Sequence, residues 1–326
     1  MPSTGHRTGH LTEDGASGSG KTEAVVDEEE TVTVNPTAPH TIVLIHGLWM
    51  TPLSWEDWVD RFTSRGHRVL APSWPGLDME IEQLRRDPSP IAPLTITEIV
   101  DHYERIIRNL DRPPIIMGHS FGGGFTQVLL DRGLGAAGVA IDSAPSRGVL
   151  KVPWSTIRVS WPAVRNPANR HRAVGLTPKQ FHFAFTNTLS DGESAKVYER
   201  YHVPGAGHVL FEGFLANLEP RSALRVDYRK RDRAPLLFIA GGLDHVVPPA
   251  VNRSNVKLYR KGSAIVEYKE FPGRSHYTLG QDGWDEVADY GLRWATEKAV
   301  TVPRSQSTPA PSQGSSVSGG IPTSTL

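Results

Sequence analysis

The sequence predicts a domain of the α/β class, in which a mostly parallel sheet is covered by helices on both faces. Two observations lead to this fold class. Short, mostly apolar segments rich in branched residues alternate along the chain with longer segments whose apolar residues recur at helical spacing. Segments of the first kind are typical of strands buried on both faces, and a parallel sheet between helices buries its strands in that way.

Six segments are predicted to be the strands of this sheet. Ile42-Val43-Leu44-Ile45 is the first, and the others comprise residues 68–71, 115–117, 137–141, 236–240 and 264–268. Each is too short for a helix of ordinary length and is mostly apolar, which favours a buried strand.

Helices are predicted between the strands and after the last one. Residues 55–62 follow a Thr-Pro start signal and place Trp55, Trp58 and Phe62 at helical spacing. The run Thr95-Ile96-Thr97-Glu98 is a capping box, which predicts that a helix begins there. Two further helices are predicted over residues 125–130 and 284–295.

Three segments depart from this alternation. Residues 1–35 and 303–326 are predicted to be disordered tails, because their Gly-, Ser- and Thr-rich composition holds too little apolar surface to offset the entropy of ordering. The domain is therefore predicted to span residues 36–302. Within it, residues 149–229 show no clear strand but many Pro, Trp and Phe residues, and this insertion is predicted to be a helical lid over an apolar pocket. A helical subdomain without a role at the pocket is the alternative.

Composition argues against several classes of protein. Lys+Arg 35 balances Asp+Glu 35, so the whole chain gives no electrostatic reason to expect nucleic acid or an anionic membrane as partner. Cysteine is absent, which excludes disulfides and thiolate metal sites. Neither a secretory signal nor an apolar run long enough for a membrane span is found, and a cytoplasmic protein is expected.

A phosphate-loop pattern occurs in residues 15–22, Gly-Ala-Ser-Gly-Ser-Gly-Lys-Thr. The pattern binds phosphate only where a buried strand leads into it and a helix begins after it. Polar residues precede this run, and an acidic run at 27–30 follows it and would repel phosphate. We therefore expect no nucleotide binding.

The segment Gly118-His119-Ser120-Phe121-Gly122 carries the most specific chemical signal. It follows a predicted strand and precedes a predicted helix, which is the context in which a Gly-x-Ser-x-Gly turn presents a nucleophilic serine. A serine hydroxyl needs a base, and His276, in the loop after the last predicted strand, is predicted to take its proton.

Two aspartates could orient the imidazole of His276. Asp244 follows the strand at 236–240 in a Gly-Gly-Leu-Asp loop, whereas Asp142 directly follows the strand at 137–141. Asp244 is favoured because it gives the order Ser, Asp, His with the acid on a loop opened by glycines.

The remaining site residues are predicted from their places along the chain. The backbone N–H groups of Leu48 and Phe121 are expected to form an oxyanion hole. Trp49, Phe181 and Phe185 are candidates for the substrate pocket, although Trp49 could equally pack in the core. His46 and His119 are predicted to be structural, and the other histidines show no metal-ligand spacing, so no metal site is expected.

Four segments together resemble the α/β-hydrolase superfamily, and in particular its lid-bearing serine esterase-like members. They are HGLW at 46–49, GHSFGG at 118–123, GGLDHVVP at 241–248 and GRSHY at 273–277, and the resemblance covers roughly residues 39–300. It implies an eight-stranded, mainly parallel sheet, a lid inserted after the sixth strand, and an acyl-serine intermediate. Haloalkane dehalogenases and epoxide hydrolases of this superfamily carry aspartate at the position of Ser120, so the chain differs from them.

The expected activity is hydrolysis of a carboxylic ester or lactone of a hydrophobic small molecule, without a cofactor. Cofactor-free perhydrolysis of the haloperoxidase type and carbon–carbon bond hydrolysis use the same triad and remain alternatives. A ligand-binding module without turnover is a third alternative, which a complete triad with an oxyanion loop disfavours.

Overall fold

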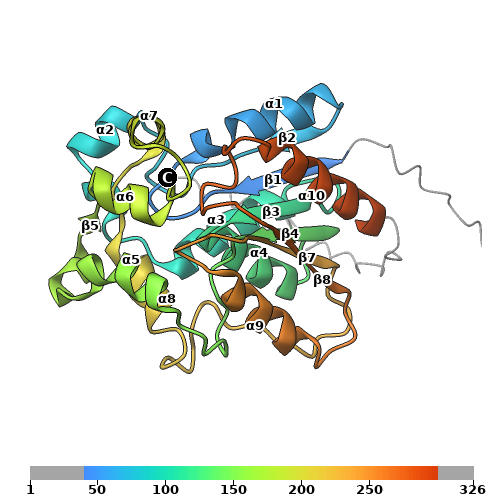
Figure 1. Cartoon of the computed structure of the whole chain (residues 1–326). Coiled ribbons are helices and arrows are strands. Elements are labelled where there is room, and N and C mark those ends of the chain that lie inside the picture. The colour runs from blue at the N-terminus through green and yellow to red at the C-terminus, as the bar shows by residue number, and fades with distance from the viewer. Residues whose placement is uncertain (1–39, 300–326) are drawn as a thin grey trace, which may run out of the picture. The chain divides into compact units, whose positions relative to one another are not determined.

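The central sheet has six parallel strands in the order β2-β1-β3-β4-β7-β8 (Figure 1). The computed structural model describes residues 40–299. The strands are β1 (Thr41–Ile45), β2 (Arg68–Leu70), β3 (Ile115–His119), β4 (Ala137–Ile141), β7 (Leu236–Gly241) and β8 (Val266–Phe271). The chain builds one edge with β2, crosses back to β3 beside β1, and then builds the other edge. The order therefore reverses between β1 and β3, which is where open α/β sheets bind their ligands.

The predicted α/β class and the six predicted strand segments are confirmed, with ends that shift by up to three residues. The count of eight strands that the resemblance implied is wrong for residues 40–299, where the main sheet has six.

Helices cover both faces of the sheet, because successive strand residues point to opposite sides. Ile42 and Leu44 pack under one layer, formed by α1 (Glu56–Ser64) and α10 (Trp284–Ala299). Val43 and Ile45 belong to the core on the other side. The helices there are α3 (Ile96–Arg108), α4 (Phe121–Asp131) and α9 (Pro249–Tyr259), and Figure 1 shows the two layers above and below the strands.

A local signal accounts for the start of α3. The capping box before α3 is confirmed, since the Thr95 hydroxyl accepts from the Glu98 N–H at 3.2 Å and the Glu98 carboxylate accepts from the Thr95 N–H at 2.9 Å. The sequence did not predict α9, whose buried face mixes the polar Asn252 and Asn255 with apolar residues such as Val256. Nor did it predict the short α2 (Ile81–Arg86).

The segment between β4 and β7 is mainly helical, as predicted. It contains α5 (Trp154–Val164), α6 (Pro178–Ala184), α7 (Asp191–Tyr201) and α8 (Gly207–Phe214). A two-residue strand β5 (Ala173–Val174) pairs antiparallel with β6 (Gly205–Ala206), which the sequence did not signal because each strand is so short. The bounds 149–229 and the role as a lid stay predictions at this point.

Several predictions concern residues outside 40–299. The tails 1–35 and 303–326 lie wholly there, and so does the phosphate-loop pattern at 15–22. Within the part of the chain that the structure describes, no helix combines the length and apolar character needed to cross a bilayer.

Candidate active site

Ser120 lies in a sharp turn between β3 and α4 and has left-handed backbone dihedrals. Its φ of 57° and ψ of −120° are unfavourable for a residue that carries a side chain. The end of β4 holds the turn, because the Ser120 N–H donates to the Ile141 carbonyl at 2.9 Å and the Ala144 N–H donates to the Ser120 carbonyl at 2.8 Å. The serine is thereby fixed at the carboxyl end of the sheet, beside the reversal in strand order.

Two glycines allow the turn to form at this place. A Cβ atom on Gly118 would lie 2.0 Å from the Gly122 carbonyl oxygen, and a Cβ atom on Gly122 would lie 2.1 Å from the Ile45 carbonyl oxygen. Non-bonded atoms do not approach so closely, so β1, β3 and α4 can pack in this way only with glycine at both positions. Backbone packing therefore explains the two glycines that flank the serine.

His276 and Asp244 form a buried pair on loops of the same sheet edge. The His276 Nδ1–H donates to Asp244 Oδ2 at 2.7 Å. The other carboxylate oxygen, Oδ1, accepts from the Val246 N–H at 2.7 Å and the Val247 N–H at 2.9 Å. These bonds fix the carboxylate, which in turn fixes the imidazole with its Nε2 free. Among residues 40–299 this buried Nε2 has no hydrogen-bond partner.

The burial of this pair sets its protonation. Burial lowers the pKa of His276 to about 3, so the imidazole is neutral at neutral pH and Nε2 carries a lone pair. Burial raises the pKa of Asp244 to about 7, although the hydrogen bonds from the Val247 and Val246 N–H groups act to lower it. A neutral imidazole with an oriented Nδ1–H is the form that can accept a proton at Nε2.

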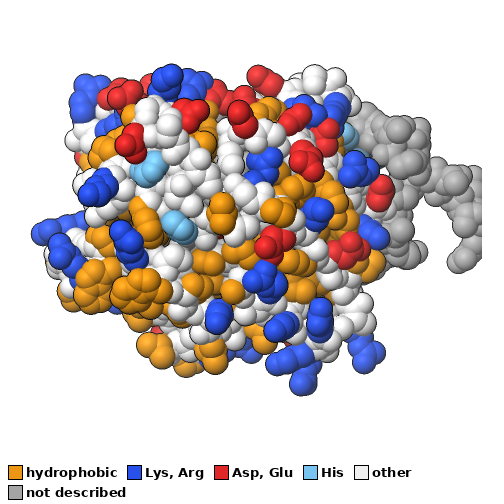
Figure 2. All heavy atoms as spheres, in the orientation of Figure 1, with side chains coloured by type: hydrophobic (Ala, Val, Ile, Leu, Met, Phe, Trp, Pro, Cys, Tyr) orange, Lys and Arg blue, Asp and Glu red, His pale blue; other side chains and the backbone are white. Residues whose placement is uncertain are grey.

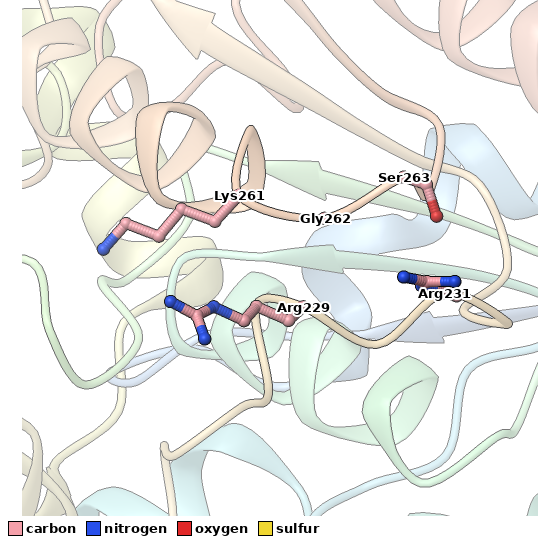
Figure 3. A pocket seen from close by; sticks show the side chains of 5 residues that line it. All are labelled: Arg229, Arg231, Lys261, Gly262 and Ser263. Atoms are coloured by element: carbon pink, nitrogen blue, oxygen red, sulfur yellow. The ribbon is translucent and has the colours of Figure 1, made fainter.

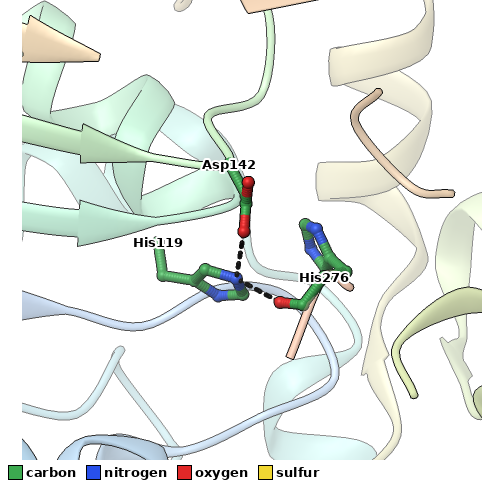
Figure 4. A group of neighbouring side chains, drawn as sticks. All are labelled: His119, Asp142 and His276. Carbon is green, nitrogen blue, oxygen red and sulfur yellow. Dashed lines mark hydrogen bonds and ion pairs between the residues drawn. The ribbon is translucent and has the colours of Figure 1, made fainter. Parts of the chain in front are cut away.

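Ser120 and His276 are linked through His119, the last residue of β3. The His119 Nε2–H donates to the His276 carbonyl oxygen at 2.9 Å, and the two imidazole rings lie 4.6 Å apart between centroids (Figure 4). Ser120 and His276 are not directly hydrogen-bonded in the described part of the chain. The sequence predicted a structural role for His119 but not this link, because a backbone carbonyl acceptor leaves no sequence signal.

Asp142 lies close to this group but does not contact the His276 ring through a hydrogen bond. Its Oδ1 accepts from the Gly241 N–H at 2.6 Å, and its Oδ2 lies 4.0 Å from His119 Nε2 and has no hydrogen-bond partner among residues 40–299 (Figure 4). Burial, and then the negative charge of Asp244, raise the pKa of Asp142 well above its usual value. The structure thus brings both predicted acids to one site and joins only Asp244 to the imidazole.

The loop after β1 lies against Ser120, as the oxyanion-hole prediction requires. A Cβ atom on Gly47 would lie 2.7 Å from the Ser120 Cβ atom and 3.3 Å from its Oγ atom. Among residues 40–299, neither the Leu48 N–H nor the Phe121 N–H donates a hydrogen bond to another protein group. Two unused N–H donors beside a serine hydroxyl are what an oxyanion needs.

His46 supports this loop. Its Nδ1–H donates to the Gly47 carbonyl at 2.9 Å, and its Nε2 accepts from the Trp74 N–H at 3.3 Å. Burial lowers the pKa of His46 to about 4, which keeps the ring neutral. These contacts agree with the predicted structural role.

The three predicted pocket aromatics pack together, and one of them, Phe185, contacts His276. The Phe185 ring lies 4.8 Å from the His276 ring between centroids, and Phe181 stacks on Phe185 at 4.8 Å. The Trp49 ring meets Phe185 edge-on at 6.1 Å, and its indole N–H donates to the Val174 carbonyl at 2.8 Å. All three side chains are buried. Together they form an apolar wall, which contacts the imidazole through Phe185 and is supplied by the insertion and by the loop after β1.

His119, Asp142 and His276 also form a compact group of possible metal ligands, with one ligand atom from each lying within 4.8 Å of the others. The hydrogen bonds argue against a cation there. His119 Nε2 faces a carbonyl oxygen and is therefore an N–H donor, and His276 Nδ1 donates to Asp244. The expectation of no metal and no cofactor stays a prediction.

An opening of about 330 Å³ is lined by residues that precede β7 and β8, at the amino ends of these strands. It is lined by Arg229, Arg231, Lys261, Gly262 and Ser263 (Figure 3). The lining contains none of the predicted site residues.

Comparison with known proteins agrees with the fold. A sequence model of the alpha/beta hydrolase family matches residues 42–290. No curated protein sequence matches the chain.

Several solved structures are similar. A monoacylglycerol lipase from Paleococcus ferrophilus is 19% identical with a TM-score of 0.54, and the match covers 80% of this chain and 96% of the lipase. A pyrethroid hydrolase from Sphingobium faniae is 16% identical with a TM-score of 0.56, covering 79% of this chain and 98% of that one. Tomato methylketone synthase I is 14% identical with a TM-score of 0.54, covering 80% and 99%. At these identities the likeness shows the fold alone.

Proposed function

Because the chain belongs to the alpha/beta hydrolase family, we propose that it is a serine hydrolase that cleaves a carboxylic ester or lactone of a hydrophobic small molecule. The observation that carries the proposal is the buried Asp244–His276 pair, whose free Nε2 belongs to the same sheet edge as the strained Ser120 turn. The fold hosts many activities, so the argument rests on these residues.

The chemistry follows from the geometry in two steps. The Ser120 oxygen attacks the ester carbonyl carbon while His276 Nε2 takes the hydroxyl proton, and Asp244 stabilises the resulting imidazolium. The Leu48 and Phe121 N–H groups stabilise the negative oxygen of the tetrahedral intermediate. His276 then gives the proton to the leaving alcohol, and an acyl-serine forms. Water, deprotonated by His276, attacks the acyl-serine and releases the acid and free Ser120.

A hydrophobic substrate is proposed because the wall beside His276 consists of Trp49, Phe181 and Phe185. Apolar lining with a few polar groups is typical of sites for uncharged small molecules.

A lid role for the insertion is part of the proposal. Only 5% of the Ser120 surface is exposed, and His276 is fully buried. Two insertion helices cover the site: Phe185, at the end of α6, packs on His276, and a Cβ atom on Gly213 of α8 would lie 2.7 Å from the Phe121 ring. A substrate can therefore reach Ser120 only if these helices move.

Labelling and turnover by the serine variant test the proposal. A fluorophosphonate probe should label the wild-type protein once, at Ser120. Ser120→Ala should abolish labelling and lower turnover of a p-nitrophenyl ester by about 10⁴-fold or more. Ser143→Ala is the matched control, because this buried serine lies at the end of the neighbouring strand and bonds Gln127.

Screening p-nitrophenyl esters against lactones identifies the bond that is cleaved. Labelling at another serine, or an active Ser120→Ala protein, would overturn the assignment of the nucleophile. Labelling of Ser120 without turnover of any ester or lactone would overturn the proposed activity and keep the nucleophile.

A further inference from the structure

Large apolar side chains that face solvent are concentrated on the helical insertion. Within residues 40–299, seven of the nine large apolar residues with exposed side chains lie between residues 150 and 218. Four precede or belong to α5, namely Leu150, Val152, Trp154 and Trp161. The other three, Phe214, Leu215 and Leu218, lie at the end of α8. We call these seven residues the insertion face.

The two parts of this face are neighbours in space. Helices α5 and α8 contact each other. The Asn217 side chain donates to the Val149 carbonyl at 2.7 Å and accepts from the Gly148 N–H at 2.7 Å, so the segments of Leu150 and Leu218 are tied together. Figure 2 shows hydrophobic side chains gathered over α5 and α8, with basic side chains beside them. An apolar surface of this kind marks an interaction site.

The charge around the insertion face has one sign. Seven basic residues and no acidic residue occur between Asp142 and Asp191. None of the seven forms an ion pair with another residue in 40–299. Six of them are exposed, namely Lys151, Arg158, Arg165, Arg170, Arg172 and Lys179. The neutrality of the whole chain therefore hides a strongly basic segment.

Aromatic and basic side chains alternate along one stripe of α5. Trp154, Arg158, Trp161 and Arg165 follow one another at intervals of four, three and four residues, which places them on one helix face. Trp154 is 76% exposed and Trp161 is 58% exposed. Tryptophan favours the boundary between water and hydrocarbon, and arginine and lysine bind the phosphates just outside it.

We propose that the insertion face docks on the surface of an anionic lipid bilayer. The apolar side chains would enter the headgroup region, and the unpaired basic side chains would meet lipid phosphates. A second copy of the chain is a poorer occupant, because two such faces would bring like charges together. The exposed acid on the α8 side is Glu219, whose carboxylate accepts from the Arg221 N–H at 3.1 Å.

Docking there would bring lipid next to the candidate active site. Gly213, which precedes Phe214, lies against Phe121, the residue after Ser120. The Thr156 hydroxyl of α5 donates to the Val246 carbonyl at 2.8 Å, in the loop that carries Asp244. Helix α8 therefore contacts the residue after Ser120, and helix α5 contacts the loop that carries Asp244. The inference itself rests on surface composition and not on the proposed hydrolysis.

Vesicle co-sedimentation of the full chain tests the proposal, in a Ser120→Ala background so that no lipid is hydrolysed. Phosphatidylcholine vesicles containing phosphatidylglycerol should bind the protein, and vesicles of phosphatidylcholine alone should bind at least about tenfold more weakly. High salt should weaken the binding, because it screens the exposed charges.

Paired variants separate the two contributions. Trp154→Ala with Trp161→Ala, and separately Lys151→Glu with Arg165→Glu, should each weaken partitioning by about tenfold or more. If the double tryptophan variant does not fold, Trp154→Ala alone, at the more exposed position, should still show a clear loss. The matched controls are Arg229→Glu with Lys261→Glu, at the basic opening of Figure 3, and Ile265→Ala, an exposed apolar side chain elsewhere; both should leave binding unchanged.

Three outcomes would overturn the proposal. The protein could fail to bind anionic vesicles at low salt, or it could lose binding in the Arg229/Lys261 control and keep it in the tryptophan variant. A dimer that light scattering detects and that Trp154→Ala dissociates would show that a second copy covers the face.

Discussion

The loops that follow β4 and β7 differ in how they use a buried aspartate, although the two strands are neighbours in the sheet. Asp142 directly follows β4, has a left-handed φ of 44°, and turns its Oδ1 to the Gly241 N–H of the next strand. Asp244 lies three residues beyond the end of β7, where its Oδ1 takes two N–H donors of its own loop and its Oδ2 faces His276.

This difference shows what a triad acid needs beyond burial and a place at the right sheet edge. Both carboxyl groups are buried, but only Asp244 has one oxygen held by the backbone and the other within reach of Nδ1. Burial, and then the charge of Asp244, raise the pKa of Asp142, which favours the protonated form of its carboxyl group. In that form Asp142 adds no second negative charge beside the imidazole.

The largest effect is expected for Asp244→Asn. The amide keeps the shape but presents an N–H or a neutral oxygen to His276, which favours the wrong tautomer, so turnover of a small ester should fall by about 10⁴-fold. Thermal melting checks that the variant folds. If Asp244→Asn stays active while Asp142→Asn is inactive, the roles assigned to the two aspartates are wrong, because Asp142 would then be the triad acid.

A smaller effect is expected at the apolar side of His276. Phe185→Ala should change the preference between short and long acyl esters by roughly tenfold, because it empties part of the wall beside the imidazole. Phe181→Ala, one ring further from His276, should change it less. Rate constants for an ester series, measured with melting temperatures, test this. If both variants fail to fold, or if a variant that folds keeps the selectivity of wild type, these rings belong to the core rather than to the pocket.

A still smaller effect on turnover is expected for Asp142→Asn. The raised pKa of Asp142 favours its neutral form, and its side chain makes no hydrogen bond to His276. The amide oxygen of the variant can still accept from the Gly241 N–H. Turnover of the same small ester should fall by less than about tenfold, since no contact with the reacting groups is lost. A drop comparable to that of Asp244→Asn would show that Asp142 acts in the chemistry.

The sequence predicted the site residues where a local pattern ties them to the backbone. The turn at Ser120 is specified by glycines whose Cβ atoms would collide with neighbouring strands, and such constraints are visible in a pentapeptide. Six strands were visible for a similar reason, since a buried strand needs a short apolar run. The extra strands came from the resemblance alone, and the main sheet of residues 40–299 lacks them.

The parts that could not be predicted depend on contacts between distant segments. No local sequence pattern indicates that His119 donates to the His276 carbonyl, or that the charge of Asp244 acts on the carboxyl group of Asp142. The basic segment around the insertion face was hidden for a different reason. A net charge taken over the whole chain averages a basic segment with acidic ones, so it says little about any single surface.

The smallest expected effect concerns stability and follows from the protonation of Asp142. Its pKa is raised in the folded protein above the usual 3.8, so the folded state holds a proton that the unfolded state releases. The stability associated with this proton is complete below 3.8 and is lost as the pH rises through the folded pKa. Asp142→Asn cannot lose a proton, so its melting temperature relative to wild type should rise as the pH increases above 3.8 towards the raised pKa of the folded state.

Asp142→Ala provides the control for that pH dependence. It also removes the titration, but it leaves the Gly241 N–H without its acceptor, which costs about 1–3 kcal/mol at every pH. Its melting temperature should therefore lie below that of Asp142→Asn by a constant amount, while both change in parallel relative to wild type. A constant difference between Asp142→Asn and wild type across this range would mean that Asp142 ionises at its ordinary pKa. The two loops would then hold two charges beside one imidazole, and the distinction drawn between them would fail.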